Sequence, residues 1–194
     1  MKICVFCSSS NALADIYFEE ARLLGRLIGE TGHQLVNGGA NVGLMETITI
    51  SASAAGAKTI GIIPEMLKSR ALVSNSAHQI IVTADMQERK RKMREISDAF
   101  IALPGGFGTL EEILEVITLR QLSYHTKPIV FINTNGFFNN LFNQFEVAYN
   151  QRFAKDIYRK LFHVADNSQE AMKYIDNYIP EVLDSKWFVV PEKQ

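Results

Sequence analysis

The 194-residue chain lacks the features that define several protein classes. Two cysteines are too few for a disulfide-built secreted scaffold. The longest apolar run near the N-terminus is about five residues, far below the roughly 18 of a membrane span. Lysine plus arginine (20) nearly balance aspartate plus glutamate (21), so no overall field attracts nucleic acid. We expect a cytoplasmic protein with no membrane anchor and no nucleic-acid partner.

Metal and redox motifs are also missing. Cys4 and Cys7 form a single CxxC inside an apolar strand-like run, where buried thiols are expected rather than a redox pair. The four histidines, His33, His78, His125 and His163, have neither HxxxH nor HExxH spacing. We therefore expect no protein-held metal.

Short apolar runs alternate with segments of helical period along most of the chain. Such apolar strands are covered on both faces, and their alternation with helices requires right-handed crossovers. The pattern predicts an α/β fold, a Rossmann-like open parallel sheet with helices on both faces. It forms a single nucleotide-binding domain over residues 1–180, followed by a C-terminal arm over 181–194 that contains Trp187–Val190. The expected strands are Lys2–Cys7, Gln34–Asn37, Lys58–Pro64, Gln79–Thr83, Ala99–Pro104, Pro128–Asn133 and Leu161–Ala165. The expected helices are Asp15–Thr31, Val42–Gly56, Met86–Ser97, Thr109–Tyr124, Phe137–Gln151 and Ser168–Tyr178.

Ligands bind beyond the carboxyl ends of the strands in such sheets, and three loops there are unusual. They are Cys7–Ser10, Asn37–Gly43 and Pro104–Thr109. The last runs from a strand through three glycines into a helix, which leaves free backbone N–H groups at the positive end of a helix dipole. This predicts an anion site, with a tight turn and a Thr109-x-x-Glu112 capping box as the structural alternative.

Two familiar nucleotide loops are absent. No GxxxxGK[ST] motif occurs, and the first strand-to-helix turn, Ser8–Asn11, has no glycine for a dinucleotide fingerprint. A redox role with NAD is therefore not favoured. The Asn37–Gly43 loop fits either a ribose or base contact or a close turn with Leu44 and Met45 in the core.

A basic segment and a set of carboxylates complete the candidate site. Five of the six residues in Arg89–Arg94 are basic, which fits a solvated helix face with one or two side chains turned toward phosphate or ribose oxygens. Cleavage of an N-glycosidic bond needs a carboxylate near C1′ to stabilise an oxocarbenium-like sugar and to orient water. If a 5′-phosphate lies on the glycine loop, Glu111, Glu112 and Glu115 in the first turns of the following helix are all close enough to C1′ to be this carboxylate.

Glu88-Arg89-Lys90 followed by PGGFGTLEE resembles the LOG (Lonely Guy) family of cytokinin-activating phosphoribohydrolases. The resemblance includes Cys7–Ser10, Asn37–Met45 and Lys127-Pro128, and so covers most of residues 1–150. It implies a Rossmann-like homodimer that converts a nucleoside 5′-monophosphate, AMP or N6-substituted AMP, into free base and ribose 5-phosphate. We expect no cofactor.

The resemblance also assigns roles to single residues. It makes Arg89 and Glu112 the catalytic pair, and Gly105, Gly106, Gly108 and Thr109 the phosphate loop. The other substrate-binding positions it implies are Ser9, Gly38, Gly39, Met45, Lys90, Phe107, Glu111 and Thr118.

The chain departs from the family at four positions. Many members have glycine where Ser8, Ala40 and Glu46 stand and tyrosine where Asn37 stands, which leaves the choice of substrate open. Two other functions compete with hydrolysis: a non-catalytic nucleotide sensor or carrier that uses the same loop, and a decarboxylase with pyridoxal phosphate on a lysine, a label that LOG proteins often carry.

Overall fold

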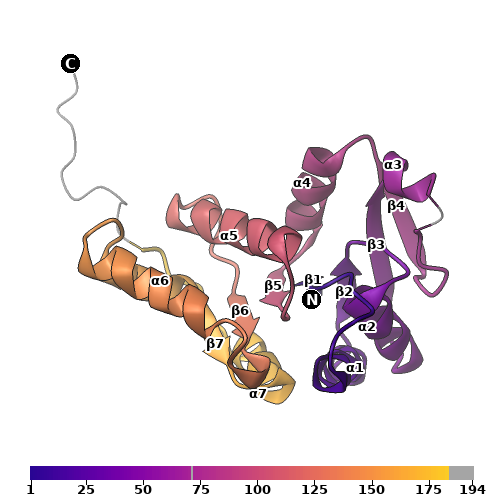
Figure 1. Ribbon diagram of the computed structural model, residues 1–194, viewed down its shortest axis with the longest axis horizontal. Helices are drawn as coiled ribbons and strands as arrows, with labels where there is room; N and C mark the ends of the chain where they lie inside the picture. The colour runs from indigo at the N-terminus through magenta and orange to yellow at the C-terminus, as the bar shows by residue number, and fades with distance from the viewer. Residues whose placement is uncertain (71, 184–194) are drawn as a thin grey trace.

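The computed structural model describes residues 1–70 and 72–183. Seven apolar segments form one parallel sheet in the order β4-β3-β2-β1-β5-β6-β7 (Figure 1). The strands are β1 (Lys2–Phe6), β2 (Gln34–Asn37), β3 (Thr59–Pro64), β4 (Gln79–Thr83), β5 (Ala99–Ala102), β6 (Ile129–Ile132) and β7 (His163–Ala165).

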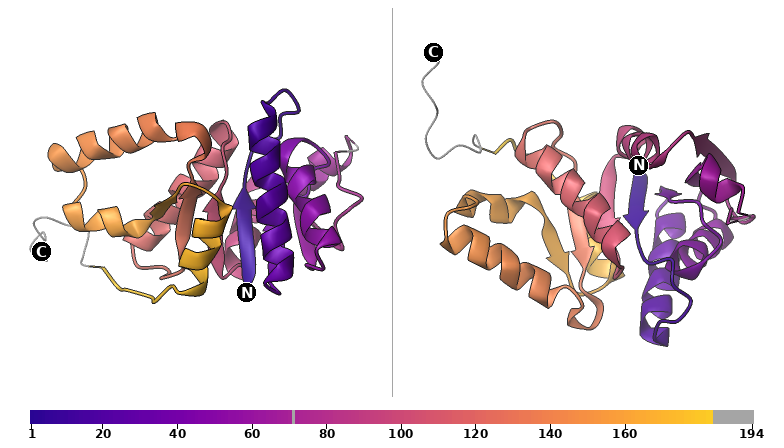
Figure 2. Two further views of the ribbon diagram at one scale, coloured as in Figure 1. Left: turned by 90° about the horizontal axis from the view of Figure 1, so that it is seen from below. Right: turned by 45° about the horizontal axis from the view of Figure 1, so that its top comes forward.

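Helices cover both faces of this sheet, as the two views of Figure 2 show. α1, α2 and α7 pack on one face, and α4, α5 and α6 pack on the other. The helices are α1 (Asp15–Glu30), α2 (Gly43–Ala54), α3 (Glu65–Lys68), α4 (Met86–Ile96), α5 (Phe107–Gln121), α6 (Asn139–Asn150) and α7 (Ser168–Asp176), with short 3-10 segments η1 (Thr134–Gly136) and η2 (Asp156–Leu161). The predicted fold class is confirmed.

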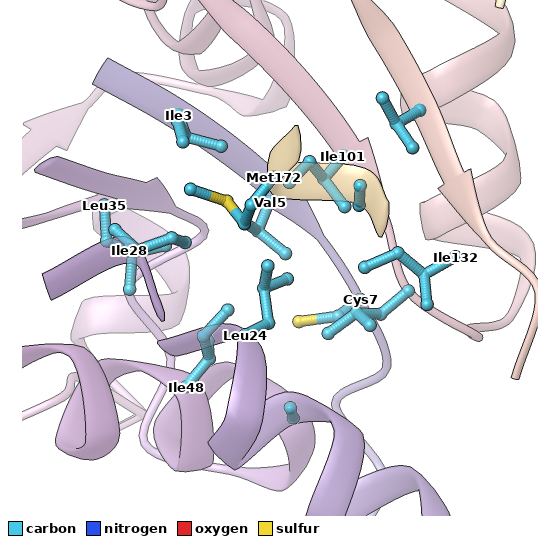
Figure 3. Close-up of a cluster of buried hydrophobic side chains, with 14 of the residues drawn as sticks. Ile3, Val5, Cys7, Leu24, Ile28, Leu35, Ile48, Ile101, Ile132 and Met172 are labelled. Atoms are coloured by element: carbon cyan, nitrogen blue, oxygen red, sulfur yellow. The ribbon is translucent and has the colours of Figure 1, made fainter. Parts of the chain in front are cut away.

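Alternate residues of the central strand supply the two halves of the core. Ile3 and Val5 point into the cluster with α1, α2 and α7 (Figure 3), whereas Cys4 and Phe6 face α4 and α5. Both cysteines are buried, as expected, and burial raises the pKa of the Cys4 and Cys7 thiols, which keeps them protonated.

The strand order reverses between β1 and β5. β2, β3 and β4 extend the sheet on one side of β1, and β5, β6 and β7 extend it on the other. α4 carries the chain from the edge strand β4 back to β5. This reversal opens a crevice at the carboxyl ends of β1 and β5, which is where ligands bind in open α/β sheets.

Three details differ from the sequence-based expectations. α5 begins at Phe107, with Gly106 as N-cap, rather than at Thr109. The last strand is shorter than expected because Leu161 ends η2. The short elements α3, η1 and η2 were not predicted, since segments this brief carry no clear periodicity. Within the described residues no helix is long and apolar enough to cross a membrane. Of the expected C-terminal arm, residues 184–194 lie outside the described residues.

Candidate active site

A cavity of about 460 Å³ lies at the carboxyl ends of β1 and β5. The three unusual loops meet there, as the parallel sheet requires. Its lining residues are Val5, Phe6, Cys7, Ser8, Ser9, Ser10, Gly38, Ala40, Val42, Met45, Leu67, Leu72, Met86, Arg89, Met93, Gly106, Phe107, Gly108, Thr109, Glu111 and Glu112. One wall is therefore a polar and glycine-rich surface, and the other is formed by apolar side chains.

Arg89 is the basic residue of α4 that turns inward. Asp85 is the N-cap of α4, and its side chain accepts from the Glu88 N–H at 2.8 Å, while the Glu88 carboxylate accepts from the Ala84 N–H at 2.7 Å. This capping fixes the phase of the first turn, so that Arg89 points at the cavity and is only 7% exposed. Its Nε donates to the carbonyl of Ile62 on β3 at 3.1 Å.

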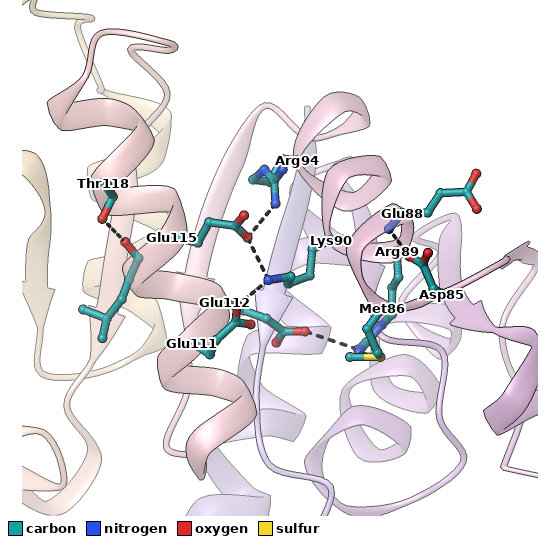
Figure 4. A network of polar contacts seen from close by, with 11 residues as sticks. Asp85, Met86, Glu88, Arg89, Lys90, Arg94, Glu111, Glu112, Glu115 and Thr118 are labelled. Carbon is teal, nitrogen blue, oxygen red and sulfur yellow. Dashed lines mark hydrogen bonds and ion pairs between the residues drawn. The ribbon is translucent and has the colours of Figure 1, made fainter.

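Glu112 faces Arg89 across the crevice. Its Oε1 lies 3.4 Å from Arg89 Nη2, and the two side chains are 10% and 9% exposed (Figure 4). Burial raises the pKa of the Glu112 carboxyl, and the Arg89 charge opposes this shift only in part. Glu112 is thus a desolvated carboxyl held beside a fixed cation.

The two neighbouring carboxylates lie in other surroundings. Glu111 pairs with Lys90 and its side chain is 55% exposed, although it also lines the cavity. Glu115 lies 2.6 Å from Arg94 and 3.4 Å from Lys90. Of the three candidates from the sequence, Glu112 alone is buried against an arginine at the cavity.

The glycine loop leaves the N-terminus of α5 open. Gly106 caps the helix without a side-chain hydrogen bond, so the first N–H groups of α5 keep free donor capacity. A Cβ at Gly106 or at Gly108 would meet no heavy atom within 4 Å, so packing within the protein does not demand glycine there. Open space beside free amides at the positive end of a helix is suited to an anion.

The structure does not contain the capping box that was the alternative reading of Thr109 and Glu112. Thr109 lies within the first turn of α5 and is buried, and Glu112 faces Arg89 instead of returning to the Thr109 amide. A Cβ at Gly105 would overlap the Thr109 side chain, which explains the glycine at that position. The helix starts two residues earlier than expected because Phe107 and Gly108 adopt helical geometry.

The Asn37–Gly43 loop and the residues that follow it lie between the core and the cavity. Leu44 is fully buried in the core, whereas Gly38 and Met45 line the cavity. The Asn37 side chain accepts from the Gly39 N–H at 2.9 Å and donates to Thr49 Oγ1 at 2.8 Å. Asn37 therefore holds the loop from behind.

Replacing Gly38 with alanine is expected to displace the Arg89 side chain. The added Cβ would overlap Arg89 Nη2 and lie 2.9 Å from Met45 Sδ, so the guanidinium has to leave its present position beside Glu112. A displacement of about 1 Å can cost about 100-fold in rate. We expect kcat to fall by that order while the nucleotide still binds. An equal fall in affinity with unchanged kcat would contradict this explanation.

Four of the predicted substrate contacts are not among the cavity-lining residues: Gly39, Lys90, Gly105 and Thr118. Lys90 bridges Glu111 and Glu115 and so ties α4 to α5. The Thr118 hydroxyl donates to the Leu114 carbonyl at 2.8 Å, farther along α5 (Figure 4). Direct contact of these residues with a substrate stays a prediction. Of the four departures from the family pattern, Ser8 and Ala40 line the cavity.

Sequence reasoning named Met45 and Phe107 but missed the other apolar residues of the cavity wall. Leu67 and Leu72 come from the connection between β3 and β4, which is held over the site by the Ala40–Val73 bridge and by the Ser74 N–H donating to the Gly39 carbonyl at 2.9 Å. No periodic pattern marks this connection. Among the missed residues, Met86 on α4 has a usable signal, since it lies one turn from Arg89 in a helix with little other apolar surface.

Comparison with known proteins identifies the family. Over 180 residues, 93% of the chain, it is 39% identical to the cytokinin riboside 5′-monophosphate phosphoribohydrolase LOG7 of Arabidopsis thaliana and covers 83% of that protein. The chain belongs to the LOG family. The LOG phosphoribohydrolase of Oryza sativa subsp. japonica is 36% identical, with 93% of this chain and 74% of that protein covered. A family model described as possible lysine decarboxylase matches residues 45–175 of this LOG-family chain.

Solved structures resemble the LOG-family chain closely. The molybdenum cofactor binding protein from Rippkaea orientalis matches with a TM-score of 0.70 and 28% identity, covering 90% of this chain and 94% of that one. The molybdenum cofactor carrier protein of Chlamydomonas reinhardtii has a TM-score of 0.67 at 23% identity, with 90% and 95% covered. The second match demonstrates the shared fold only.

Proposed function

We propose that this protein hydrolyses the N-glycosidic bond of AMP or an N6-substituted AMP to free base and ribose 5-phosphate. The observation that carries the proposal is the buried Arg89–Glu112 pair, 3.4 Å apart, in a cavity that also contains the open N-terminus of α5. The names of the LOG relatives, phosphoribohydrolases of a riboside 5′-monophosphate, support the same reaction.

The two ends of the cavity bind different parts of the substrate in this proposal. The 5′-phosphate lies on the amides of Gly106–Thr109, where the helix dipole and the Thr109 hydroxyl favour a dianion. The sugar then lies over Glu112, within the first turns of the same helix. The base faces the apolar wall formed by residues such as Leu67, Leu72 and Met45.

Arg89 and Glu112 carry the chemistry. Water adds to C1′ as the bond from C1′ to the base nitrogen breaks, and its proton finally resides on the departing base, so that no other reactant is needed. The Glu112 carboxylate stabilises the oxocarbenium-like sugar and accepts the proton of the attacking water. The Arg89 guanidinium holds Glu112 in place and donates hydrogen bonds to substrate oxygens.

Product analysis tests this proposal. Incubation with AMP should release adenine and ribose 5-phosphate, both resolved by chromatography. Adenosine should react far more slowly, because phosphate binding supplies the energy that orients C1′. Equal rates with AMP and adenosine would refute the phosphate site. A panel of N6-substituted AMP compounds then defines which base the apolar wall prefers.

The pH dependence of kcat/KM should report the unusual carboxyl. Because burial raises the pKa of Glu112, its active carboxylate forms only above the ordinary value of 4.5. Activity is then lost as pH falls through the raised pKa, so the acid limb should lie above pH 4.5. Rates measured from acid to neutral pH give the limb directly. A limb at or below the ordinary carboxyl pKa would argue against Glu112 as the titrating group.

A non-catalytic carrier is the second candidate function. The likeness to a molybdenum cofactor binding protein at 28% identity favours it, since that protein is named for binding a cofactor. Tight AMP binding without product, unaffected by Glu112→Gln, would support the carrier. The buried carboxyl beside Arg89 favours the hydrolase, because a pocket that only binds an anion gains nothing from a desolvated acid.

Lysine decarboxylation fits the cavity less well. Such chemistry would need a lysine to bind pyridoxal phosphate as a Schiff base. In the part of the chain that the structure describes, no lysine is among the residues that line the cavity. Incubation with lysine and pyridoxal phosphate, followed by assay for released carbon dioxide, tests this directly.

We also propose that the protein is a cytoplasmic homodimer. The apolar side chains of α5 are the first place to look for a dimer interface. Ile113 and Val116 are not available for it, because they pack into the protein's own core. Phe107, Leu122 and Tyr124 at the two ends of α5 are exposed and remain available. Light scattering should give twice the monomer mass of 21.8 kDa. A clean monomer would remove every scheme in which a second subunit completes the site.

A further inference from the structure

A second cavity lies beside the edge strand β7, at the amino end of that strand. Its volume is about 800 Å³, within the range of small-molecule sites. It is bounded by the end of α5, the end of η2, the first residue of β7 and the end of α7. Because α5 begins at the catalytic crevice, its last turn lies roughly 20 Å away along the helix axis. The cavity is thus separate from the proposed active site.

A buried cation faces this cavity. Arg120, in the last turn of α5, is 5% exposed and lines the cavity. Its Nη1 donates to the Leu161 carbonyl at 2.8 Å and its Nη2 to the Tyr178 hydroxyl at 2.6 Å. Its Nε is buried without a hydrogen-bond partner, and among residues 1–70 and 72–183 no carboxylate pairs with this guanidinium.

A purely structural role leaves this donor unexplained. The bonds to Leu161 and Tyr178 hold η2 and the chain after α7 against α5, and the dipole of α5 favours a cation in its last turn. Neither effect satisfies Nε, and a buried unpaired donor is costly. An arginine of this kind beside an open cavity is suited to bind an anion in a planar, directional way.

The other residues that line the cavity indicate the charge of the anion and the kind of group attached to it. Lys173 lines the cavity and, within the described residues, forms no ion pair, so it adds a second free positive charge. The two carboxylates there are already engaged, Glu170 with His163 at 3.2 Å and Glu181 with Lys160 at 3.0 Å. The aromatic and apolar lining residues are Phe162, Tyr174, Tyr178 and Ile179.

We infer that this cavity is a second ligand site, specific for a small aromatic phosphomonoester. Arg120 and Lys173, which no carboxylate of the described residues neutralises, match a dianion better than a single carboxylate. The aromatic side chains around Arg120 offer a surface for a flat ring, with Tyr174 already held in place by stacking on His163 at 4.2 Å. The site goes beyond the proposed hydrolysis, since neither Arg89 nor Glu112 belongs to it.

Nuclear magnetic resonance of the full-length protein can test the inference with phenyl phosphate as the probe. The side-chain N–H signal of Arg120 Nε reports the unpaired donor, and the backbone amides of 173–178 report the cavity walls. Backbone amides of 105–109 report the catalytic loop in the same spectra. Ionic strength is kept constant so that general screening does not move the signals. Inorganic phosphate and benzoate serve as probes that lack the ring or the second charge.

Saturable shifts of the Arg120 signal by phenyl phosphate, with weaker binding of inorganic phosphate and of benzoate, would support the site. Lys173→Glu should weaken this binding about fivefold or more and leave the shifts at 105–109 unchanged. Lys58→Glu, the same charge change at an exposed lysine between α2 and β3, should have no effect. Because Lys173 is exposed, its variant tests the site even where replacing Arg120 prevents folding.

Three results would overturn the inference: no shift of Arg120 Nε at about 10 mM phenyl phosphate, equal affinity for inorganic phosphate, or equal binding by the Lys173→Glu variant. None of them bears on hydrolysis, because the readout requires no turnover. Loss of AMP cleavage with an intact Arg120 response would, conversely, remove the proposed function and leave this site.

Discussion

Replacing Glu112 with glutamine is expected to lower kcat for AMP hydrolysis by about 10²- to 10⁴-fold. The amide fits the same space and places an oxygen opposite Arg89, but it neither takes a proton from water nor offers a negative charge to the oxocarbenium-like sugar. Binding of the 5′-phosphate is some distance from this change, so KM should move by only a few-fold. Product formation at saturating AMP is the measurement.

The matched control is Glu115→Gln, one turn along the same helix. Glu115 pairs with Arg94 and Lys90 outside the catalytic cavity, so its variant should retain kcat within a few-fold. If both variants lose activity equally, the loss comes from disturbing the charges on α5 and not from the chemistry of Glu112.

Thermal unfolding separates a chemical defect from a folding defect. A carboxyl whose pKa is raised in the folded state binds its proton more tightly there than in the unfolded chain. Its contribution to stability therefore falls as pH rises from the ordinary pKa through the raised one. At neutral pH the uncharged glutamine avoids that loss, so Glu112→Gln should melt at or above the wild-type temperature.

Replacing Arg89 with alanine is expected to lower kcat by about 10²- to 10³-fold, the range found when one preorganised donor is removed. The variant should also change the pH profile in a defined direction. Arg89 lowers the pKa of Glu112, so its removal should move the acid limb of the residual activity to higher pH. The shift distinguishes an electrostatic role of Arg89 from a role in packing alone.

Arg91→Ala is the control for this variant. Arg91 lies on the same helix, is 64% exposed and pairs only weakly with Glu95 at 4.0 Å. Its replacement should leave both kcat and the acid limb as they are in the wild type. An acid limb that stays in place in Arg89→Ala would contradict the coupling between Arg89 and Glu112.

The sheet and the meeting of the three loops were predictable from the sequence because they depend on local patterns. Apolar runs bounded by glycine, proline and asparagine fixed most strands to within one or two residues, and parallel strands bring the following loops to one edge. The family resemblance had paired Arg89 with Glu112, and the structure brings these two side chains together.

The choice among similar side chains was not predictable from pattern alone. Five basic residues of α4 look alike in sequence, and Arg89 turns inward because the Ile62 carbonyl accepts from it and Gly38 has no side chain to block it. Glu112 and Glu111 differ by one position, so the start of α5 at Phe107 decides which one is buried. The cavity around Arg120 depends on segments distant in sequence and left no local signal.

The crossover of α4 between the two halves of the sheet has a kinetic consequence. Arg89 is anchored to β3 on one side of the strand reversal, whereas Glu112 follows β5 on the other. A chain that has assembled only one half can contain full helices and yet have no paired acid and cation. During refolding, recovery of enzymatic turnover should therefore lag behind recovery of the helical circular dichroism signal. The rate at which turnover recovers then reports how fast the two halves of the sheet dock.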